Sequence, residues 1–197
     1  MPRDVDHAAR RRALAEALWR VVRREGIHRI SVRTVAAEAG TSPGALRHYF
    51  TTQDDLAAFA LQAVVDRVRA RLTERLPALQ GRDAAVYLLE QLLPLDDERR
   101  DETAVYLGFL GRPHGEDRLR EIRGMAESSS REAVTVALRM LAEAGCLHPG
   151  RDVEAEVDRL YAMVDGLALH GTLWPERFPA EHLRGVLHSH LRSLAET

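Results

Sequence analysis

The chain has 197 residues, of which 45% are hydrophobic and 29% charged, and its formal net charge is −2. This length allows one domain or two small ones with a sizeable core, and a single cysteine excludes an intrachain disulfide framework. No signal peptide and no membrane-spanning apolar run are present, so we expect a cytoplasmic protein. Alternating β-branched runs are absent as well. The composition therefore predicts an all-α fold of about nine helices.

The charge is uneven along the chain. All 28 basic residues are arginine, and residues 1–56 carry 10 of them against 7 acidic side chains. The remaining residues carry 18 arginines against 23 acidic side chains. A modestly basic N-terminal part (residues 1–56, here called the head) followed by an acidic remainder (the body) is typical of a DNA-binding domain joined to a regulatory domain.

The first predicted helix covers about residues 5–25. Leu14, Leu18 and Val21 recur at helical spacing on its apolar face, and Gly26 ends it. The side chain of Trp19 is expected to pack in the same core.

Residues 31–50 then predict two short helices joined by a tight turn. Ser31 is a candidate N-cap, and Gly40 suits a left-handed C-cap. Ser42 can cap the next helix, where Pro43 occupies the first helical position and its missing N–H costs nothing. This layout is that of a helix-turn-helix, whose second helix enters the DNA major groove.

The residues predicted to face outward on the second helix suit that task. Gly44 and Ala45 keep the helix surface low, and Arg47 offers two parallel donors that match the O6 and N7 atoms of guanine. His48 and Tyr49 can reach phosphate oxygens. Spacing alone also fits an ordinary helical hairpin with a solvated arginine.

The segment resembles the DNA-binding domain of the TetR family of bacterial transcriptional regulators. The matching positions are small caps, core residues and turn glycines: Gly26, Ser31, Val32, Val35, Ala36, Ala39, Gly40, Thr41, Ser42, Gly44, Leu46, His48, Tyr49, Phe50 and Leu56. Two positions depart from the family pattern. Arg47 replaces a tyrosine, and Gln53 replaces a lysine that commonly neutralises a phosphate.

The resemblance implies a DNA-binding domain over residues 1–52, with the family signature extending to about residue 68. A ligand-binding and dimerisation domain would follow over residues 53–197. The implied DNA contacts come from both helices of the motif and the start of the fourth helix: Ser31, Arg33, Thr41, Ser42, Pro43, Gly44, Ala45, Arg47, His48, Tyr49, Thr52 and Gln53.

The sequence of the body predicts a series of helices. Apolar periodicity, prolines and glycines place them at about residues 53–76, 84–93, 96–111, 116–144, 152–173 and 179–194. The fourth helix, residues 53–76, starts in the head and ends in the body. We expect it to link the two mechanically.

Residues 164–173 are apolar nearly all round, which indicates deep burial or an oligomer interface. The resemblance to the TetR family implies that the last two helices form a four-helix dimer interface with their copies, and residues 164–175 also look like the ligand-binding half of a BetI-type subgroup. The predicted interface residues are Val164, Leu167, Ala168, Gly171, Leu183, Val186, Leu187 and Leu191.

Large side chains in the body are candidates for an effector pocket, although each also fits an ordinary core position. These are Tyr87, Tyr106, Phe109, His114, Met125, Tyr161 and Trp174. The nine histidines form no metal-ligand pattern, and no phosphate loop or nucleophile elbow occurs. We therefore expect no metal, no cofactor and no enzymatic activity.

The sequence as a whole predicts a homodimeric, ligand-responsive DNA-binding regulator. Its most direct form is a repressor that binds a palindromic operator and is released by a small hydrophobic effector. An activator on the same scaffold is a third interpretation, which the sequence does not exclude. The alternative from another class is a helical enzyme or a small-molecule-binding protein without operator binding.

Overall fold

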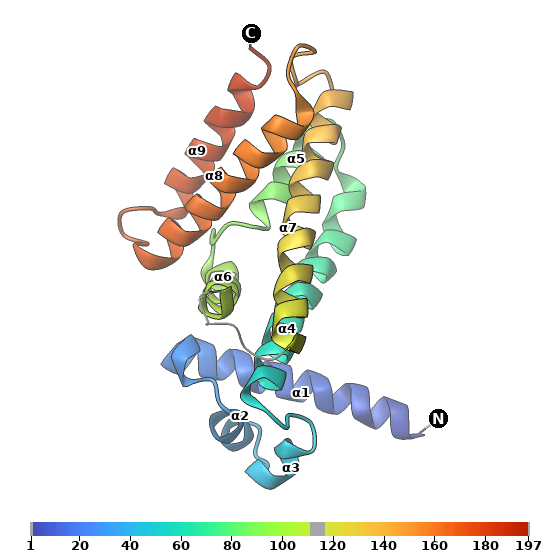
Figure 1. The fold of residues 1–197 in the computed structure, drawn as a ribbon, viewed down its shortest axis with the longest axis vertical. Coiled ribbons are helices and arrows are strands. Elements are labelled where there is room, and N and C mark those ends of the chain that lie inside the picture. The colour runs from blue at the N-terminus through green and yellow to red at the C-terminus, as the bar shows by residue number, and fades with distance from the viewer. Residues whose placement is uncertain (1, 111–116, 197) are drawn as a thin grey trace. The chain divides into compact units, whose positions relative to one another are not determined.

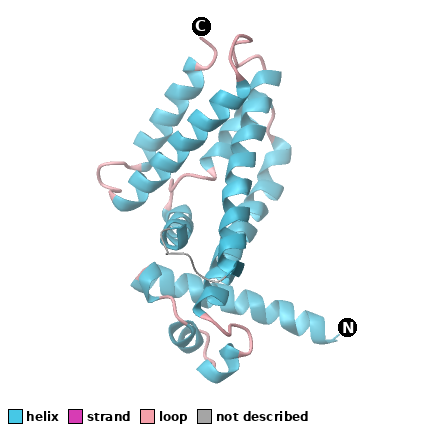
Figure 2. Cartoon of the chain, in the orientation of Figure 1, coloured by secondary structure: helices cyan, strands magenta, loops and turns pink. Residues whose placement is uncertain are grey.

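The computed structural model describes residues 2–110 and 117–196. Side chains are described for residues 9–108, 120–121 and 123–196. Within these ranges every regular element is a helix and no strand occurs (Figure 2). The all-α prediction is confirmed, because the described residues form nine α-helices and two short 3₁₀ turns.

The chain divides into two compact units, here called the first and second units. The first unit comprises Met1–Val65 and Ala104–Gly124, and the second comprises Asp66–Thr103 and Met125–Thr197. Three helices contribute residues to both units: α4 (Gln53–Arg75), α6 (Asp97–Leu110) and α7 (Asp117–Glu143). Each of these helices is continuous across the boundary.

The first unit begins with three helices in chain order (Figure 1). They are α1 (Pro2–Glu25), α2 (Val32–Glu38) and α3 (Pro43–Arg47), with the 3₁₀ turn η1 (Ile27–Arg29) between the first two. Their core is continuous with the start of α4, since Leu18, Val35, Leu46 and Leu56 are all buried in one hydrophobic cluster. Trp19 is 2% exposed in that cluster, as expected.

The second unit is built around α5 (Gly81–Glu90), α8 (Val153–Leu173) and α9 (Ala180–Ser193). Helices α8 and α9 run side by side (Figure 1). Leu138 of α7, Leu160 of α8 and Leu187 of α9 are fully buried in a second hydrophobic cluster. Each unit therefore has its own core.

The two units do not follow the expected division at residue 52. The first half of α4 lies in the first unit because Phe59, Ala60 and Ala63 pack in its core. Val105 of α6, which is 0% exposed, belongs to that core too. Each compact unit thus combines residues from distant parts of the sequence, whereas the prediction divided the chain into two contiguous segments.

Candidate nucleic-acid interface and effector region

The start of α2 is fixed by a reciprocal capping box. Ser31 Oγ accepts from the Thr34 backbone N–H at 3.1 Å, and the Ser31 backbone N–H donates to Thr34 Oγ1 at 3.0 Å. Two backbone donors that the helix leaves unpaired are satisfied in this way. The predicted cap at Ser31 is therefore present, with Thr34 as its partner.

The turn between α2 and α3 depends on Gly40. Its φ of 64° lies in the left-handed region, which glycine adopts without steric cost. The Thr41 backbone N–H donates to the Ala36 carbonyl at 3.0 Å and closes the end of α2. Ser42 Oγ then accepts from the Ala45 N–H at 3.1 Å, with Pro43 at the first helical position. These local features hold α3 in place although it is only 5 residues long.

The side chains predicted to contact DNA fall into two groups. Arg33, Ser42, Pro43, Gly44, Arg47, His48 and Gln53 are exposed, whereas Ser31, Thr41, Ala45, Tyr49 and Thr52 are partly buried. Leu46 and Phe50 instead point into the core, at 1% and 6% exposure. The motif therefore presents Arg47 at the surface beside the low surface formed by Gly44 and Ala45.

The start of α4 carries a second capping box that the sequence analysis missed. The Asp55 N–H donates to Thr52 Oγ1 at 3.0 Å, while Asp55 Oδ2 accepts from the N–H groups of both Thr51 and Thr52 at 3.0 Å. The pattern Thr-x-x-Asp is a sequence signal for this arrangement. Thr52 therefore has a capping role in addition to any contact with DNA.

Gln53 also has an internal partner. Its Nε2 donates to the carbonyl of Ile30, two residues before the start of α2, at 2.8 Å and so joins the start of α4 to the segment that leads into α2. The sequence analysis treated Gln53 only as a weakened phosphate contact. Since the side-chain amide is engaged within the protein, its first role is to fix the position of α2.

A carboxylate clamp joins α1 to α2. Glu38 Oε1 accepts from Arg20 Nε at 2.6 Å, and Glu38 Oε2 accepts from Arg24 Nη1 at 2.8 Å. The hydrogen bonds from Arg20 and then Arg24 hold the pKa of Glu38 below its ordinary value. Glu38 is therefore ionised at neutral pH and fixes one end of α2.

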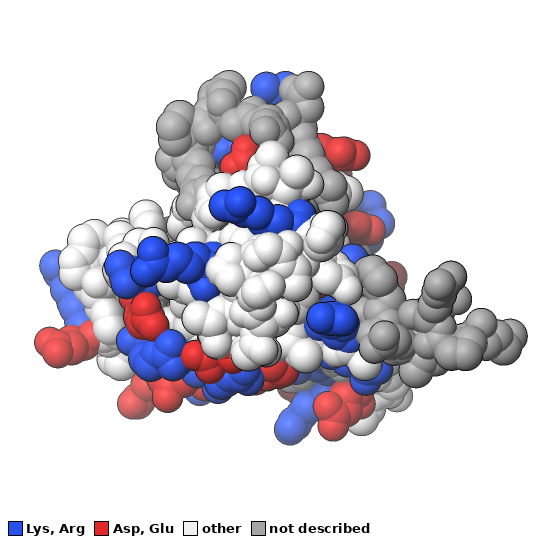
Figure 3. All heavy atoms as spheres, turned by 90° about the horizontal axis from the view of Figure 1, so that it is seen from below, with Lys and Arg blue, Asp and Glu red and all other residues white. Residues whose placement is uncertain are grey.

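Figure 3 shows arginine groups separated by uncharged surface, with acidic groups along the lower part of the view. The arginines drawn in this view do not form one continuous basic patch. Specific contacts from individual arginines would have to supply much of the affinity for DNA.

The predicted pocket residues that the structure describes are divided between the two units, and their role stays a prediction. Tyr106 packs on the core of the first unit, whereas Tyr161 packs on the core of the second. Met125 and Trp174 are each 52% exposed. The side chain of Phe109 and the whole of His114 lie outside the described residues. Large size alone selected these residues, and helix register then directs them to different surroundings.

Tyr87 lies in a polar cluster that the sequence analysis did not identify, here called the Arg71 cluster. Arg71 of α4 donates from Nη1 and Nη2 to the two oxygens of Glu102 at 2.7 and 2.6 Å. Arg71 Nε donates to Gln91 Oε1 at 2.9 Å, and the Tyr87 hydroxyl donates to the Arg71 carbonyl at 3.2 Å. This cluster ties α4, α5 and α6 together within the second unit.

Burial dominates the electrostatics of the Arg71 cluster. Glu102 is 3% exposed, and burial raises its pKa although Arg71 opposes this effect. No sequence signal could have paired these residues, because 31 positions separate Arg71 from Glu102. Their approach depends on how three helices pack.

The predicted dimer interface falls largely on side chains that a single chain already covers, and it stays a prediction. Seven of its eight residues are buried within a single chain, because they form the packing between α8, α9 and the rest of the core: Val164, Leu167, Ala168, Gly171, Leu183, Leu187 and Leu191. Val186 alone is partly buried. A side chain already covered within one chain has little surface to offer a second copy.

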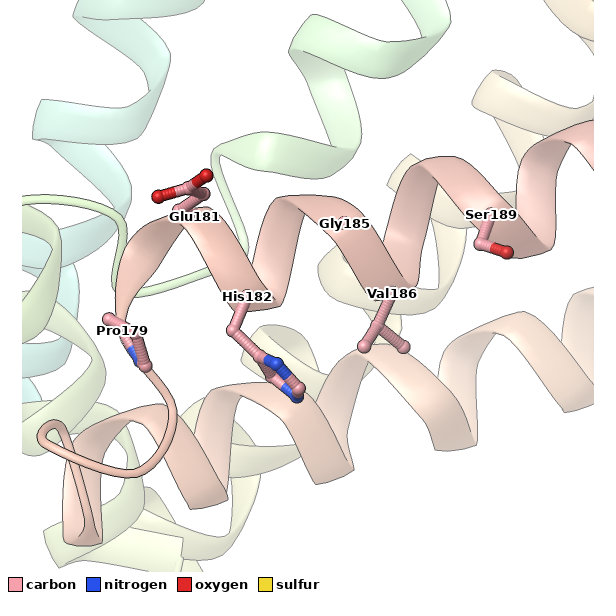
Figure 4. Close-up of a pocket in the computed structure, with 6 residues that line it drawn as sticks. All are labelled: Pro179, Glu181, His182, Gly185, Val186 and Ser189. Carbon is pink, nitrogen blue, oxygen red and sulfur yellow. The ribbon is translucent and has the colours of Figure 1, made fainter.

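A shallow hollow lies on the outer side of α9. Its lining comes from one helix and the residue before it: Pro179, Glu181, His182, Gly185, Val186 and Ser189. His182 and Val186 project to the same side of α9, while Glu181 points the other way (Figure 4). An ideal Cβ at Gly185 would have nothing within 4 Å, so this part of the helix can be approached closely.

The described residues contain neither a membrane-spanning helix nor a group of metal ligands. None of their helices is long and apolar enough to cross a membrane. Among the same residues, no three histidine, cysteine or acidic side chains are grouped so as to hold a metal ion.

Comparisons with known proteins agree with this architecture. Residues 14–59 match the model of bacterial regulatory proteins of the tetR family, and residues 81–196 match the C-terminal model of BetI-type transcriptional repressors. The chain is 36% identical over 196 residues to the HTH-type transcriptional regulator PksA of Bacillus subtilis, covering 98% of this chain and 94% of PksA.

Two solved structures extend the likeness. A transcriptional regulator from Rhodococcus sp. Rha1 is 35% identical with a TM-score of 0.77, and the match covers 93% of this chain and 95% of that one. The multidrug binding protein EbrR, complexed with imidazole, is 28% identical with a TM-score of 0.62, over 92% of this chain and 94% of that one.

Proposed function

Because the chain belongs to the TetR family of transcriptional regulators, with a C-terminal region of the BetI type, we propose that it is a homodimeric repressor acting in the cytoplasm. In this proposal residues 1–52 read a palindromic operator, and residues 53–197 bind an effector and dimerise. The observation that carries the proposal is the position of α3 at the surface. Ser42 caps the start of α3, and the hydrogen bond from the Thr41 N–H to the Ala36 carbonyl closes the end of α2 before it. No enzymatic role is part of it.

Arg47 is the proposed base reader. Its side chain is exposed on α3, directly after the buried Leu46 that anchors the helix. A bidentate contact with guanine contributes about 1–3 kcal/mol, and a dimer makes the contact twice. Arg33 near the start of α2 is the second candidate reader, since it too is exposed.

The test is titration of operator and scrambled duplexes with Arg47→Ala at several salt concentrations. We expect operator affinity to fall by about 2–6 kcal/mol, with a much smaller change for the scrambled duplex. Arg139→Ala, at an exposed position of α7, is the matched control and should leave both affinities unchanged. Equal weakening of both duplexes would make Arg47 a phosphate contact and shift base reading to Arg33.

The dimer contact is proposed on the outer sides of α8 and α9 instead of on their buried stripe. Leu169 and Leu173 are 39% and 54% exposed, one turn apart on α8. On α9 the hollow around Gly185 allows a second helix to come close. Gly185→Arg should therefore yield monomers in sedimentation at micromolar concentration, whereas wild-type protein should be dimeric.

Effector binding is proposed in the second unit by analogy with EbrR, whose structure holds a small ligand. Helices α4 and α6 carry residues of both units, so a shift of either helix in the second unit reaches the first. Linkage then requires that effector lowers operator affinity by the same factor by which operator lowers effector affinity. An effector whose affinity is unchanged by saturating operator would contradict this coupling.

The rival proposal is a helical enzyme or binding protein without an operator. Retention of the protein on its own upstream DNA at moderate salt separates the two, since non-specific binding weakens steeply with salt. Loss of all retention there would favour the rival. Reporter expression with and without the gene would then distinguish a repressor from an activator.

A further inference from the structure

The strongest unexplained feature of the second unit is the buried pair between Arg71 and Glu102. Glu102 is 3% exposed and Gln91 is 5% exposed, so three of their oxygens form an acceptor set inside the protein. Arg71 fills that set with its planar head: two parallel N–H groups meet Glu102, and Nε meets Gln91. The geometry is that of a recognition site for a planar cation.

Arg71 and Glu102 differ in how easily each side chain can move from the pair into solvent. The Arg71 side chain is 22% exposed, whereas that of Glu102 is only 4% exposed. Arg71 Nη1 also lies 4.0 Å from Glu98 Oε1, and the Glu98 side chain is 47% exposed. Arg71 can therefore turn toward Glu98 and solvent, while Glu102 remains buried.

This asymmetry decides the charge of a ligand that could enter. An anion that captured Arg71 would leave Glu102 buried without a cation, which is strongly unfavourable. A cation that replaced Arg71 would keep Glu102 paired. The partly exposed Arg71 would turn toward solvent and share Glu98 with Arg67, whose Nη1 lies 3.3 Å from Glu98 Oε1. Exchange of one cation for another is the favoured event at this site.

We propose that Glu102 and Gln91 form a binding site for an effector carrying an amidinium or guanidinium group, which Arg71 occupies while no effector is bound. The proposal rests on the effector-binding function proposed above and names the chemical class of the effector. Entry of the cation would release α4 from α5 and α6, because Arg71 supplies the contacts that join them in this cluster.

An internal competitor lowers the apparent affinity of a ligand by the fraction of molecules in which the site is open. Removing Arg71 should therefore strengthen cation binding, and removing the charge of Glu102 should abolish it. A merely structural ion pair predicts no cation binding by the wild-type protein, so binding by wild type that Glu102→Gln abolishes separates the two interpretations.

The experiment is calorimetric titration of the DNA-free protein with benzamidine, using neutral benzamide as the matched ligand control. We expect wild-type protein to bind benzamidine, Glu102→Gln to lose binding, and Arg71→Ala to bind about tenfold more tightly or better. Glu154→Gln, which alters an exposed glutamate near Arg131, should bind like wild type. Circular dichroism checks that each variant is folded.

Several outcomes would overturn the proposal. These are equal binding by wild type and Glu102→Gln, equal binding of benzamide, or binding confined to Arg71→Ala, which would mean that the natural pair never opens. If Arg71→Ala does not fold, the comparison of wild type with Glu102→Gln decides alone. Since no DNA is present, failure of operator binding leaves this result intact and is detected separately in the operator assay.

Discussion

Each unit contains a glutamate held by arginine, yet the two carboxylates behave in opposite ways. In the first unit Glu38 is held by Arg20 and Arg24, which are themselves exposed at the surface. In the second unit Glu102 is held by Arg71 in a bidentate pair. The pKa of Glu38 is lowered and that of Glu102 is raised.

The difference comes from solvent and not from the strength of the contacts. All four of these hydrogen bonds are between 2.6 and 2.8 Å. The Glu38 side chain is 15% exposed and keeps some water, whereas that of Glu102 is 4% exposed. Desolvation of the charged form therefore exceeds the stabilisation that Arg71 provides. Ion-pair geometry alone does not tell whether a pair stabilises a fold.

The largest expected effect is loss of the one arginine on which Glu102 depends. Arg71→Ala leaves a buried carboxylate with no bidentate partner and should lower the free energy of unfolding by about 3 kcal/mol at neutral pH. Arg20→Ala should have a far smaller effect, because Arg24 still holds Glu38. Urea unfolding of the two variants measures the contrast.

The double variant Arg71→Ala/Glu102→Gln checks the cause. It removes the buried charge as well as its partner, so most of the lost stability should return. A double variant as unstable as Arg71→Ala would show that packing of the Arg71 stem, and not the unpaired carboxylate, accounts for the loss.

Sequence reasoning reached the first unit more fully than the second. The caps at Ser31 and Ser42 and the turn at Gly40 depend on neighbouring residues, and such local chemistry is visible in a sequence. Most helices were expected from the same kind of signal, although α5 covers Gly81–Glu90 and not the predicted residues 84–93. Which residues contact DNA, by contrast, stays a prediction.

The Arg71 cluster could not be predicted from the sequence, and for the same reason the sequence could not place the proposed dimer contact on one side of α8 and α9. Both depend on which side of a helix faces its neighbours, and that is settled only when several helices pack. Apolar periodicity correctly marked Leu183 and Leu187 as one stripe, but it could not say whether the stripe meets its own chain or a second copy.

Glycines extend the comparison of the two units with a smaller expected effect. An ideal Cβ at Gly171 would lie 2.6 Å from Leu183 Cδ1 and 2.8 Å from the rigid ring of Pro94, whereas one at Gly108 would lie 2.7 Å from Ile27 Cγ1 and 3.4 Å from Ile27 Cγ2. We expect Gly171→Ala and Gly108→Ala each to cost about 1–2 kcal/mol, because neither the proline ring nor the β-branched isoleucine side chain can easily move aside.

Thermal unfolding of both glycine variants provides the measurement. Gly124→Ala on α7 is the matched control, because its Cβ would meet nothing within 4 Å and the variant should be slightly more stable than wild type. If Gly171→Ala were as stable as Gly124→Ala, the approach of α8 to Leu183 and Pro94 would be looser than described.

The smallest expected effect is also the most direct test of the comparison, because it concerns the sign of a pH dependence. The lowered pKa of Glu38 means that its contribution to stability is present above the ordinary glutamate value of about 4.3 and is lost as the pH falls through the folded-state pKa. The raised pKa of Glu102 has the opposite consequence: its contribution is full below that ordinary value and is lost as the pH rises through the folded-state pKa. The difference in unfolding free energy between wild type and Glu38→Gln should therefore grow as the pH is raised from about 3.5 to 7, whereas the difference between wild type and Glu102→Gln should shrink. Urea unfolding at four or so pH values in this range gives both slopes. Parallel slopes would mean that Glu102 is stabilised in its ionised form as Glu38 is, and the contrast between the two units would then rest on packing alone.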